Sequence, residues 1–583
     1  AAPDGAATPQ PDYGYRLNAP LRRASHDPAF ADADAALTPD PATRSRIEAR
    51  DPNAAGAPLV VVAVIDDGLA FAHPRLTAAD GAPRVECCWL QGADAGVGAQ
   101  AGRVLFGREW RRAEIADLAA RHPRRGASLY EEAGSLALGS GRWSPLALGA
   151  THGAMTLDLA AGAARGAGSA DDLRVIGVDL PPAEVIDTTG FGLAAYVLAA
   201  FHYVFRRADE IAAAYGLTRA DVPLVVNLSF GVSGGPQDGK SRLEEALAHM
   251  IAARRALGGE TMVTMPSGNH FLAGLHGELR GAEAQGGWAK ARWRVQPCDR
   301  TPNYLEIWRP ACAREDAAAG RPARLRVEPP GFPPVEFALP ALAPTPQTSA
   351  PLWVENLVVG GKIVGQVSLD LFRGYRWRVM VILAPSQTRA AGLAVAPAGL
   401  WTVGVDVDGL GDGVIHCRIQ RDNAMRHPWQ GGLQSWFDDP RDRAFDATGK
   451  PAQDDTGAAF VRRFGSFNGL AAFDGALVVA GSDAATGRPA PYSCAGPLGL
   501  SPHLPGAVDT AMPSDDSPAL AGRRAMGVGP AAASRWIGVS AAAPQFARRA
   551  AFAFLAGTPL APVLPAPQNA ERLGVPYAQS VVA

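Results

Sequence analysis

A short apolar stretch that ends in acidic residues, Val62-Ala63-Val64-Ile65-Asp66-Asp67-Gly68, decides the fold class of this 583-residue chain. It belongs to the continuous apolar run Leu59–Ile65, which is too short to span a membrane and is typical of a strand buried on both faces of a parallel sheet. Ligands bind beyond the carboxyl ends of such strands, so Asp66 lies where functional residues gather. Taken alone, Asp66 is also explained as a turn residue that ends the strand.

Further apolar strands follow, with helical segments between them. The strands are predicted at Leu173–Val178, Leu224–Leu228 and Met262–Met265. The clearest helix is predicted over Ser241–Leu257, because its apolar residues fall on one face and it opens with a capping-box pattern. Alternation of strands and helices implies a parallel sheet covered by helices, that is, an α/β fold.

The pattern changes after about residue 273. Short alternating strands separated by Pro and Gly turns are predicted from there to about residue 470, and Gly360–Gly361 marks a hairpin. The α/β pattern returns with the apolar strand Ala476–Ala480 and the helical stretch Ala541–Ala556. We therefore expect an all-β, sandwich-like domain inserted into the α/β domain.

Composition excludes several classes of protein. Apolar residues make up 47% and charged residues 19% of the chain, as in globular proteins, and Ala1–Pro11 shows no secretory signal peptide. The net charge of −2, without long blocks of either sign, lacks the footprint of a nucleic-acid binder. Arg and Trp alternate at Arg292–Arg294 and Arg376–Trp377, which is typical of strands with one solvated face.

The cysteines give little information about the redox compartment. They are few for this length and show no CxxC spacing, so buried free thiols are favoured over disulfides. The six are Cys87, Cys88, Cys298, Cys312, Cys417 and Cys494.

Three more segments carry side chains suited to acyl-transfer chemistry. In Thr151-His152-Gly153-Ala154-Met155, the histidine opens a helix with one ring nitrogen free for general-base work. In Pro266-Ser267-Gly268-Asn269-His270, Asn269 follows a strand and offers an amide N–H to an oxyanion. In Gly538-Val539-Ser540-Ala541-Ala542-Ala543-Pro544, the serine opens another helix among small neighbours. Considered separately, the three are also explained as a poor helix cap, a Gly-Asn turn and a plain N-cap.

Together, the order Asp, His, Asn, Ser and the local contexts resemble the subtilase family of serine proteases. That family carries V-I-D-[ST]-G, H-G-T-H, a G-N turn and G-T-S-[MA]-A-x-P, where this chain reads V-I-D-D-G, H-G-A-M, S-G-N-H and G-V-S-A-A-A-P. Val225–Gly231 is similar to the family's substrate-binding strand, and Tyr492–Pro497 is similar to the S-x-x-G-P turn upstream of the serine. The departures at Ala154, Met155 and Val539 do not fall on catalytic positions of the family.

The resemblance implies a subtilisin-like fold and a serine endopeptidase that acts on proteins or peptides. It assigns Asp66, His152 and Ser540 to a catalytic triad, and the Asn269 side chain with the Ser540 backbone N–H to an oxyanion hole. The substrate pocket is assigned to Ser229, Phe230, Gly231, Ser267 and Gly268. No acidic residue is evident at its floor, which favours apolar or broad P1 residues over basic ones.

The resemblance also divides the chain. We expect an N-terminal extension (1–56), a catalytic domain in two parts (57–273 and 471–560), an inserted β-rich domain (274–470) and a C-terminal tail (561–583).

The proposed chemistry requires no cofactor. Family members often bind structural calcium, but the sequence does not locate such a site here. Asp406-Val407-Asp408-Gly409 lacks the closing Glu of a calcium loop and is better explained as a polar turn. Secretion is favoured by the family resemblance alone, and the oligomeric state stays open.

Two other functions are considered. A sedolisin-like peptidase also has a G-T-S-type serine, but that family uses Glu and Asp partners and an acidic oxyanion residue, so His152 and Asn269 argue against it. A catalytically silent subtilase-fold scaffold, whose β domain recognises a partner, is distinguished from an enzyme by covalent labelling with a serine-hydrolase probe.

Overall fold

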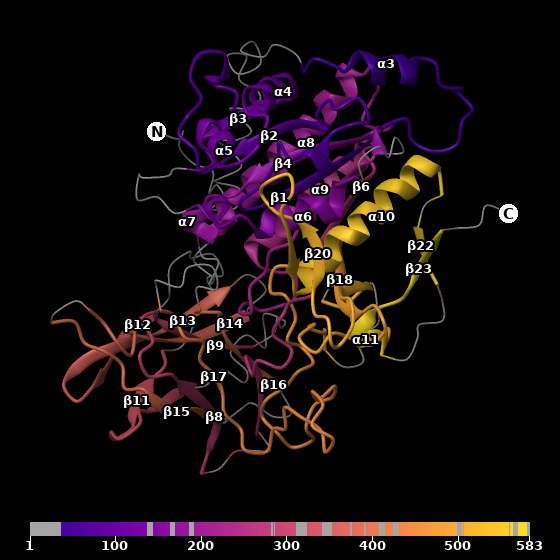
Figure 1. Ribbon diagram of the computed structural model, residues 1–583. Coiled ribbons are helices and arrows are strands. Elements are labelled where there is room, and N and C mark those ends of the chain that lie inside the picture. The colour runs from indigo at the N-terminus through magenta and orange to yellow at the C-terminus, as the bar shows by residue number, and fades with distance from the viewer. Residues whose placement is uncertain are drawn as a thin grey trace, which may run out of the picture.

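The computed structural model describes residues 37–579 with gaps at 137–143, 164–169, 186–191, 282–283, 285, 310–322, 341–352, 373–375, 390–391, 407–413, 424–430, 498–503, 505, 559 and 564–568. These residues form one eight-stranded sheet, two antiparallel sheets of five and six strands, and two short hairpins. Figure 1 shows the large sheet with its helices above and the two antiparallel sheets below.

The large sheet forms the core of the α/β domain, with strand order β19-β18-β6-β5-β1-β4-β2-β3. All neighbours are parallel except β2 and β3. β1, β4 and β5 are buried along their whole length, as their apolar runs predicted. The strands are β1 (Val60–Asp66), β2 (Val85–Leu90), β3 (Arg108–Arg111), β4 (Leu173–Asp179), β5 (Leu224–Leu228), β6 (Thr261–Pro266), β18 (Ala476–Asp483) and β19 (Thr510–Asp515).

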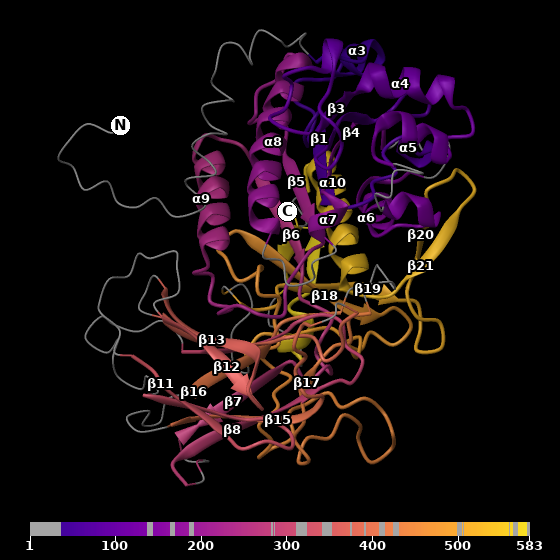
Figure 2. The same cartoon turned by 90° about the vertical axis from the view of Figure 1, so that its left-hand side faces the viewer.

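Helices cover both faces of this sheet. α8 (Leu193–Ala214) and α9 (Arg242–Ala256) pack on one face, and α6 (His152–Ala161) and α10 (Ala542–Ala556) pack on the other (Figure 2). The predicted capping box of α9 is confirmed, because Ser241 accepts from the Glu244 backbone and Glu244 accepts in return. The other helical segments are α3 (Pro41–Glu48), η1 (Pro74–Leu76), η2 (Gly98–Gln100), α4 (Arg112–Arg121), α5 (Ala127–Ala133), η3 (Pro145–Leu148), α7 (Pro182–Val185), η7 (Val539–Ala541) and α11 (Ala570–Leu573).

Within the segment that the sequence assigns to an N-terminal extension, residues 41–48 form the helix α3. Asp40 caps this helix by accepting from the Ala42 backbone, and its carboxylate also contacts Arg112 at 3.2 Å and Arg174 at 3.4 Å. The Asp-Pro pair at the start of α3 is the sequence signal that marks this helix, since Pro is favoured in the first turn and Asp at the cap.

The two antiparallel sheets pack face to face around one separate hydrophobic core, so the described part of this segment is a β sandwich. The β-sandwich segment begins after β6 and ends before β18, and these two strands pair directly in the large sheet. The strands of the sandwich therefore all fall between β6 and β18 in the chain. The strands are β7 (His276–Arg280), β8 (Trp288–Val295), β9 (Asn303–Trp308), β10 (Arg324–Glu328), β11 (Val335–Ala338), β12 (Trp353–Val359), β13 (Lys362–Phe372), β14 (Arg376–Leu383), β15 (Gly399–Asp406), β16 (Val414–Ile419) and β17 (Trp436–Phe437).

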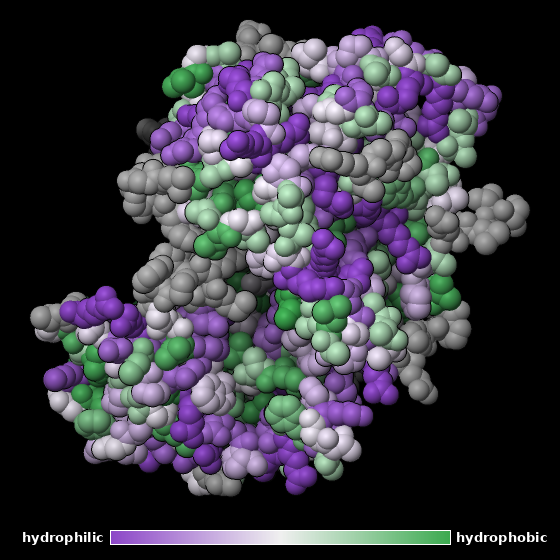
Figure 3. Space-filling view, in the orientation of Figure 1, coloured by the Kyte–Doolittle hydropathy of each residue, from purple (hydrophilic) through white to green (hydrophobic). Residues whose placement is uncertain are grey.

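Two hairpins complete the described chain. β20 (Arg523–Met526) pairs with β21 (Ala533–Trp536), and β22 (Leu560–Pro562) pairs with β23 (Tyr577–Gln579). No described helix combines the length and apolarity needed to cross a membrane. Polar and apolar side chains are mixed across the face drawn in Figure 3.

The described cysteines are free thiols. Cys87, Cys88, Cys417 and Cys494 are buried and Cys298 is exposed, whereas Cys312 lies outside the described residues. Most of the acidic turn considered for calcium, residues 407–413, also lies outside them.

Candidate active site

An aspartate and a histidine meet where β1 ends and α6 begins. The His152 Nδ1 atom lies 2.7 Å from Asp66 Oδ1 and 2.8 Å from Oδ2. Two further donors fix this carboxylate: the Thr156 hydroxyl at 2.9 Å and the Asp67 backbone N–H at 2.8 Å. Asp66 is almost fully buried, so its charge depends on these partners rather than on water. The arrangement holds the imidazole with Nδ1 toward the carboxylate and leaves Nε2 for chemistry.

Local backbone contacts explain why the histidine is followed by glycine. The Gly153 N–H donates to the Asp67 carbonyl at 3.0 Å, and a Cβ at residue 153 would lie 2.4 Å from the same oxygen. Any larger residue would therefore push α6 away from β1. Thr151 caps the helix by accepting from the Ala154 N–H, and its hydroxyl donates to the Gly68 carbonyl at 2.6 Å. The residues before and after His152 are thus each hydrogen-bonded to the turn that follows β1.

Ser540 lies in η7, at the entrance to α10. The preceding Gly538 has φ 130°, a backbone conformation that favours glycine. η7 packs against α6, and Met155 and Ala541 share a small buried cluster there. No hydrogen bond joins the Ser540 hydroxyl to His152 in the part of the chain that the structure describes. Such contacts often tighten only when substrate is bound.

Asn269 is tied to the segment that bears the serine. Its Oδ1 atom accepts from the Val539 backbone N–H at 2.8 Å. A backbone N–H can donate only to the amide oxygen, so the contact fixes the orientation of the side chain and leaves Nδ2 as a donor. A Cβ on Gly538 would lie 3.2 Å from this amide group, which is a second reason for glycine there.

The five residues assigned to the substrate pocket follow two neighbouring strands. Ser229, Phe230 and Gly231 come directly after β5, and Ser267 and Gly268 come directly after β6. Since β5 and β6 are parallel neighbours, both segments lie at the same edge of the sheet. The Ser229 hydroxyl also contacts the Ser540 carbonyl at 3.4 Å, which places this edge beside the candidate nucleophile.

Asn468 bridges these two segments, a role that the sequence did not reveal. Its Nδ2 atom donates to the Phe230 carbonyl at 3.1 Å and to the Pro266 carbonyl at 2.9 Å. A Cβ on Gly231 would lie 2.4 Å from both polar atoms of the Asn468 amide. Asn468 is only 1% exposed, so its side chain fills the gap between the ends of β5 and β6.

Asp179 is a second carboxylate beside Asp66, and it was also missed. The two residues are register partners at the ends of β4 and β1. Asp179 Oδ1 accepts from the backbone N–H groups of Gly68 at 2.6 Å and Leu69 at 3.1 Å. Burial raises the pKa of Asp179 to about 7, and the nearby charge of Asp66 adds to this effect. The side chain therefore shapes the turn that follows the candidate catalytic aspartate.

Comparison with known proteins extends the description of the fold. No protein-family model and no curated protein matches the sequence. The CspB protease of Clostridium perfringens matches 85% of this chain and 81% of its own, with a TM-score of 0.55 and 13% identity. The likeness is one of fold.

Two other solved structures are more distant. The epidermin leader peptide processing serine protease of Staphylococcus aureus has a TM-score of 0.32 at 9% identity, covering 88% of this chain and 73% of that one. A psychrophilic S41 protease has a TM-score of 0.28 at 12% identity, covering 90% and 85%. At these scores neither adds to the argument.

Proposed function

We propose that this chain is a subtilisin-like serine endopeptidase with Asp66, His152 and Ser540 as its triad. The observation that carries the proposal is the buried Asp66–His152 pair, whose carboxylate has two further donors and whose helix packs against the segment bearing Ser540. An imidazole held in this way has one nitrogen oriented by the acid and the other free, which is the arrangement that activates a serine hydroxyl.

The chemistry follows from these positions. His152 Nε2 takes the proton of the Ser540 hydroxyl as its oxygen bonds to the carbonyl carbon of the substrate. The protonated His152, stabilised by Asp66, then gives this proton to the leaving amine as the peptide C–N bond breaks and the acyl-enzyme forms. Water repeats the sequence: His152 removes its proton, the ester bond to Ser540 breaks, and the hydroxyl is restored.

In this proposal, two donors hold the oxyanion. One is Nδ2 of Asn269, which the Val539 contact leaves available, and the other is the backbone N–H of Ser540. Neither donor has to reorganise when charge develops on the oxygen, and such preorganised donors are among the largest contributions to acyl-transfer catalysis.

The substrate would be a peptide chain with a small, uncharged P1 side chain. The family resemblance assigns P1 to the residues that follow β5 and β6, and the Asn468 side chain lies between these two segments. A large P1 side chain would have to displace an amide that is buried and fully hydrogen-bonded, which is costly. The sequence alone favoured apolar or broad P1 residues, and the position of Asn468 limits this proposal to small, uncharged ones.

An activity-based probe tests the enzyme against the silent-scaffold alternative. A fluorophosphonate should label the purified wild-type chain at neutral pH and should fail to label Ser540→Ala. Mass mapping of the labelled peptide should place the adduct on Ser540. A folded wild-type chain that is neither labelled nor able to cleave any member of a peptide library would instead favour the scaffold.

A further inference from the structure

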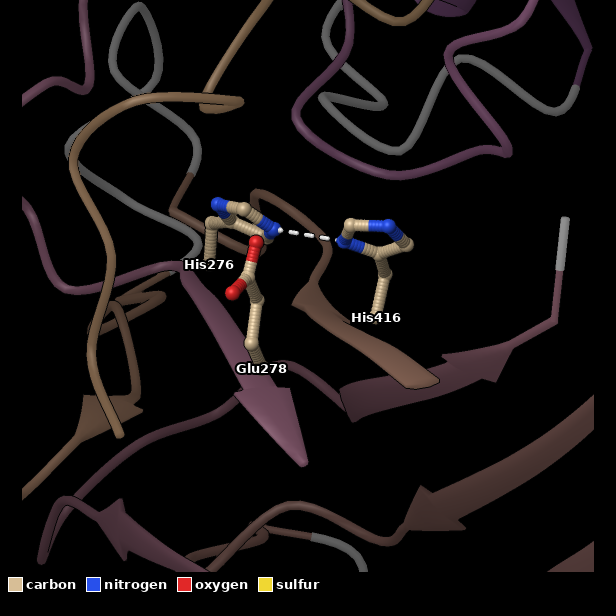
Figure 4. A group of neighbouring side chains, drawn as sticks. All are labelled: His276, Glu278 and His416. Carbon is tan, nitrogen blue, oxygen red and sulfur yellow. Dashed lines mark hydrogen bonds between the residues drawn. The ribbon is translucent and has the colours of Figure 1, made fainter. Parts of the chain in front are cut away.

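A second cluster of polar side chains lies in the β domain, away from the candidate triad. His276 and Glu278 alternate on β7, and His416 lies directly opposite Glu278 on β16. Residues two apart on a strand point to the same face, and a cross-strand partner joins them there. Figure 4 shows the three side chains rising from the two strands toward one point.

The distances within this cluster are those of a metal site. His276 Nε2 lies 3.2 Å from His416 Nδ1, and the three candidate ligand atoms all lie within 4.8 Å of one another. A tetrahedral ion with bonds of about 2.0–2.1 Å to nitrogen holds its ligands about 3.3 Å apart, close to the observed separation. Among the described residues, the only other group this compact is Asp66, Asp67 and His152 of the candidate active site.

The neighbouring side chains leave a Glu278 oxygen accessible to an ion and hold the His276 ring in place. Among the described residues, two cations contact Glu278: Arg280 at 2.5 Å and Arg462 at 3.5 Å. Both contact Oε2, which leaves Oε1 for an ion. Arg280 is 45% exposed and can turn away into solvent. The His276 ring packs on Gly465, where a Cβ would lie 2.8 Å from its Cε1 atom, so the orientation of the ring is fixed.

A third guanidinium group, Arg418, faces His276 across the strand pair. Its Nε atom donates to the Gly235 carbonyl at 3.0 Å, and the carboxylate of its register partner Glu306 offsets its charge. The Phe464 backbone lies beside the His276 ring, whose buried Nδ1 atom makes no hydrogen bond to a described residue.

We propose that His276, Glu278 and His416 bind one divalent transition-metal ion of the zinc class. Two imidazoles and one carboxylate form a donor set that zinc prefers over calcium or magnesium, which take mostly oxygen ligands. With three protein ligands, the fourth position is left to water. Catalysis by the proposed triad does not use this site. The proposed metal site and the proposed protease activity can therefore be tested independently of each other.

The site lies within the β domain, beside the segment that leads from this domain back toward β18. The His276 carbonyl accepts from the Arg462 backbone N–H at 3.0 Å, and the Gly465 N–H that follows donates to Ala495 and Gly496. The bound ion would join β7 and β16 at the point where the chain returns from the β domain toward β18. By mass action, the bound ion should therefore stabilise this edge of the β domain.

The test uses the full chain with Ser540→Ala, to prevent self-digestion, after chelator treatment and dialysis. Titration with ZnCl2 alone, followed by calorimetry, should show one ion per chain. Glu278→Gln and His416→Gln should each weaken binding roughly 100-fold or more, since loss of a ligand exceeds the 10- to 100-fold cost of losing an outer partner. The matched control His152→Gln alters the other compact cluster and should leave zinc affinity unchanged.

Two readouts keep the test decisive. Co²⁺ bound at the site should give the intense visible absorption of a four-coordinate ion, and Glu278→Gln should abolish it. Zinc should raise the melting temperature of the parent but not of the two ligand variants. The proposal is overturned if zinc does not bind, if Glu278→Gln and His416→Gln bind it as well as the parent does, or if only His152→Gln loses it.

Discussion

The Asn269 side-chain oxygen accepts a 2.8 Å hydrogen bond from the Val539 backbone N–H, although the two residues lie 270 positions apart in the chain. One hydrogen bond thus joins the turn after β6 to the residue that precedes the candidate nucleophile. It orients the Asn269 amide and couples its position to that of Ser540.

We expect Asn269→Ala to lower kcat roughly 10²- to 10³-fold with little change in KM, because only the transition state carries the negative oxygen. Asn269→Asp keeps the acceptor for Val539 and removes the donor, so it should lose at least as much activity while remaining folded. Steady-state kinetics on a small chromogenic peptide measure both variants. A loss that lies mainly in KM would show that Asn269 positions substrate instead.

Ser540→Ala should remove essentially all peptidase activity and leave the fold intact. In subtilisin, removal of the nucleophilic serine lowers kcat roughly 10⁶-fold. Circular dichroism checks the fold and a sensitive fluorogenic peptide checks the residual rate. If the purified variant retained a tenth of wild-type turnover, Ser540 would not be the nucleophile.

Thr156 should act as a positioning residue for Asp66. Thr156→Val keeps the side-chain shape but removes the hydroxyl that lies 2.9 Å from Asp66 Oδ2, so we expect a roughly tenfold lower kcat with an unchanged KM. Thr156→Ser retains the hydroxyl and should recover most of the rate. Equal losses in the Val and Ser variants would point to packing rather than to this hydrogen bond.

Asn468→Gly should enlarge the P1 pocket, because it removes the amide that spans the ends of β5 and β6. We expect the ratio of kcat/KM for a P1 Phe peptide to that for a P1 Ala peptide to rise at least about tenfold, the scale of a few apolar contacts in a pocket. The Ala peptide serves as the internal control. An unchanged ratio would place P1 elsewhere.

Asp179→Asn should stabilise the protein most at neutral and higher pH. The folded pKa of Asp179 is raised to about 7, whereas an exposed aspartate has an ordinary value near 3.9. Wild-type stability should therefore fall between about pH 4 and pH 7, by up to about 1.4 kcal/mol per pH unit from this group, and then level off.

The asparagine side chain does not ionise, so the variant Asp179→Asn lacks this pH-dependent loss of stability. Its amide oxygen can still accept from the Gly68 and Leu69 N–H groups. The difference in unfolding free energy between the variant and the wild type should thus grow from pH 4 to pH 7. Urea denaturation at pH 4.5, 6 and 8 measures it. A difference that stays constant with pH would mean that Asp179 does not titrate in this range.

The sequence predicted those features that local pattern determines. The apolar run before Asp66 predicted a buried strand, and the capping box at Ser241 marked the start of α9. Asp179 ends a buried strand in the same way as Asp66, so the same argument could have found it.

Asn468 and the histidine–glutamate cluster carry no such local signal. Asn468 gains its role from carbonyls more than 200 positions away, and His276 and His416 are 140 positions apart. The folded topology alone brings these groups together. Pairings of this kind depend on strand order and register, which alternation of apolar residues does not specify.

The insertion between β6 and β18 also sets an order of assembly during synthesis. β6 emerges from the ribosome long before its partner β18, and an unpaired strand edge is prone to join other chains. The β sandwich, with its own core, can form in the interval, and η7 and α10 are translated only after β18 and β19. A nascent chain would therefore carry Asp66 and His152 of the proposed triad without Ser540 until the segments after β19 are made, so its own folding intermediates would be spared from cleavage.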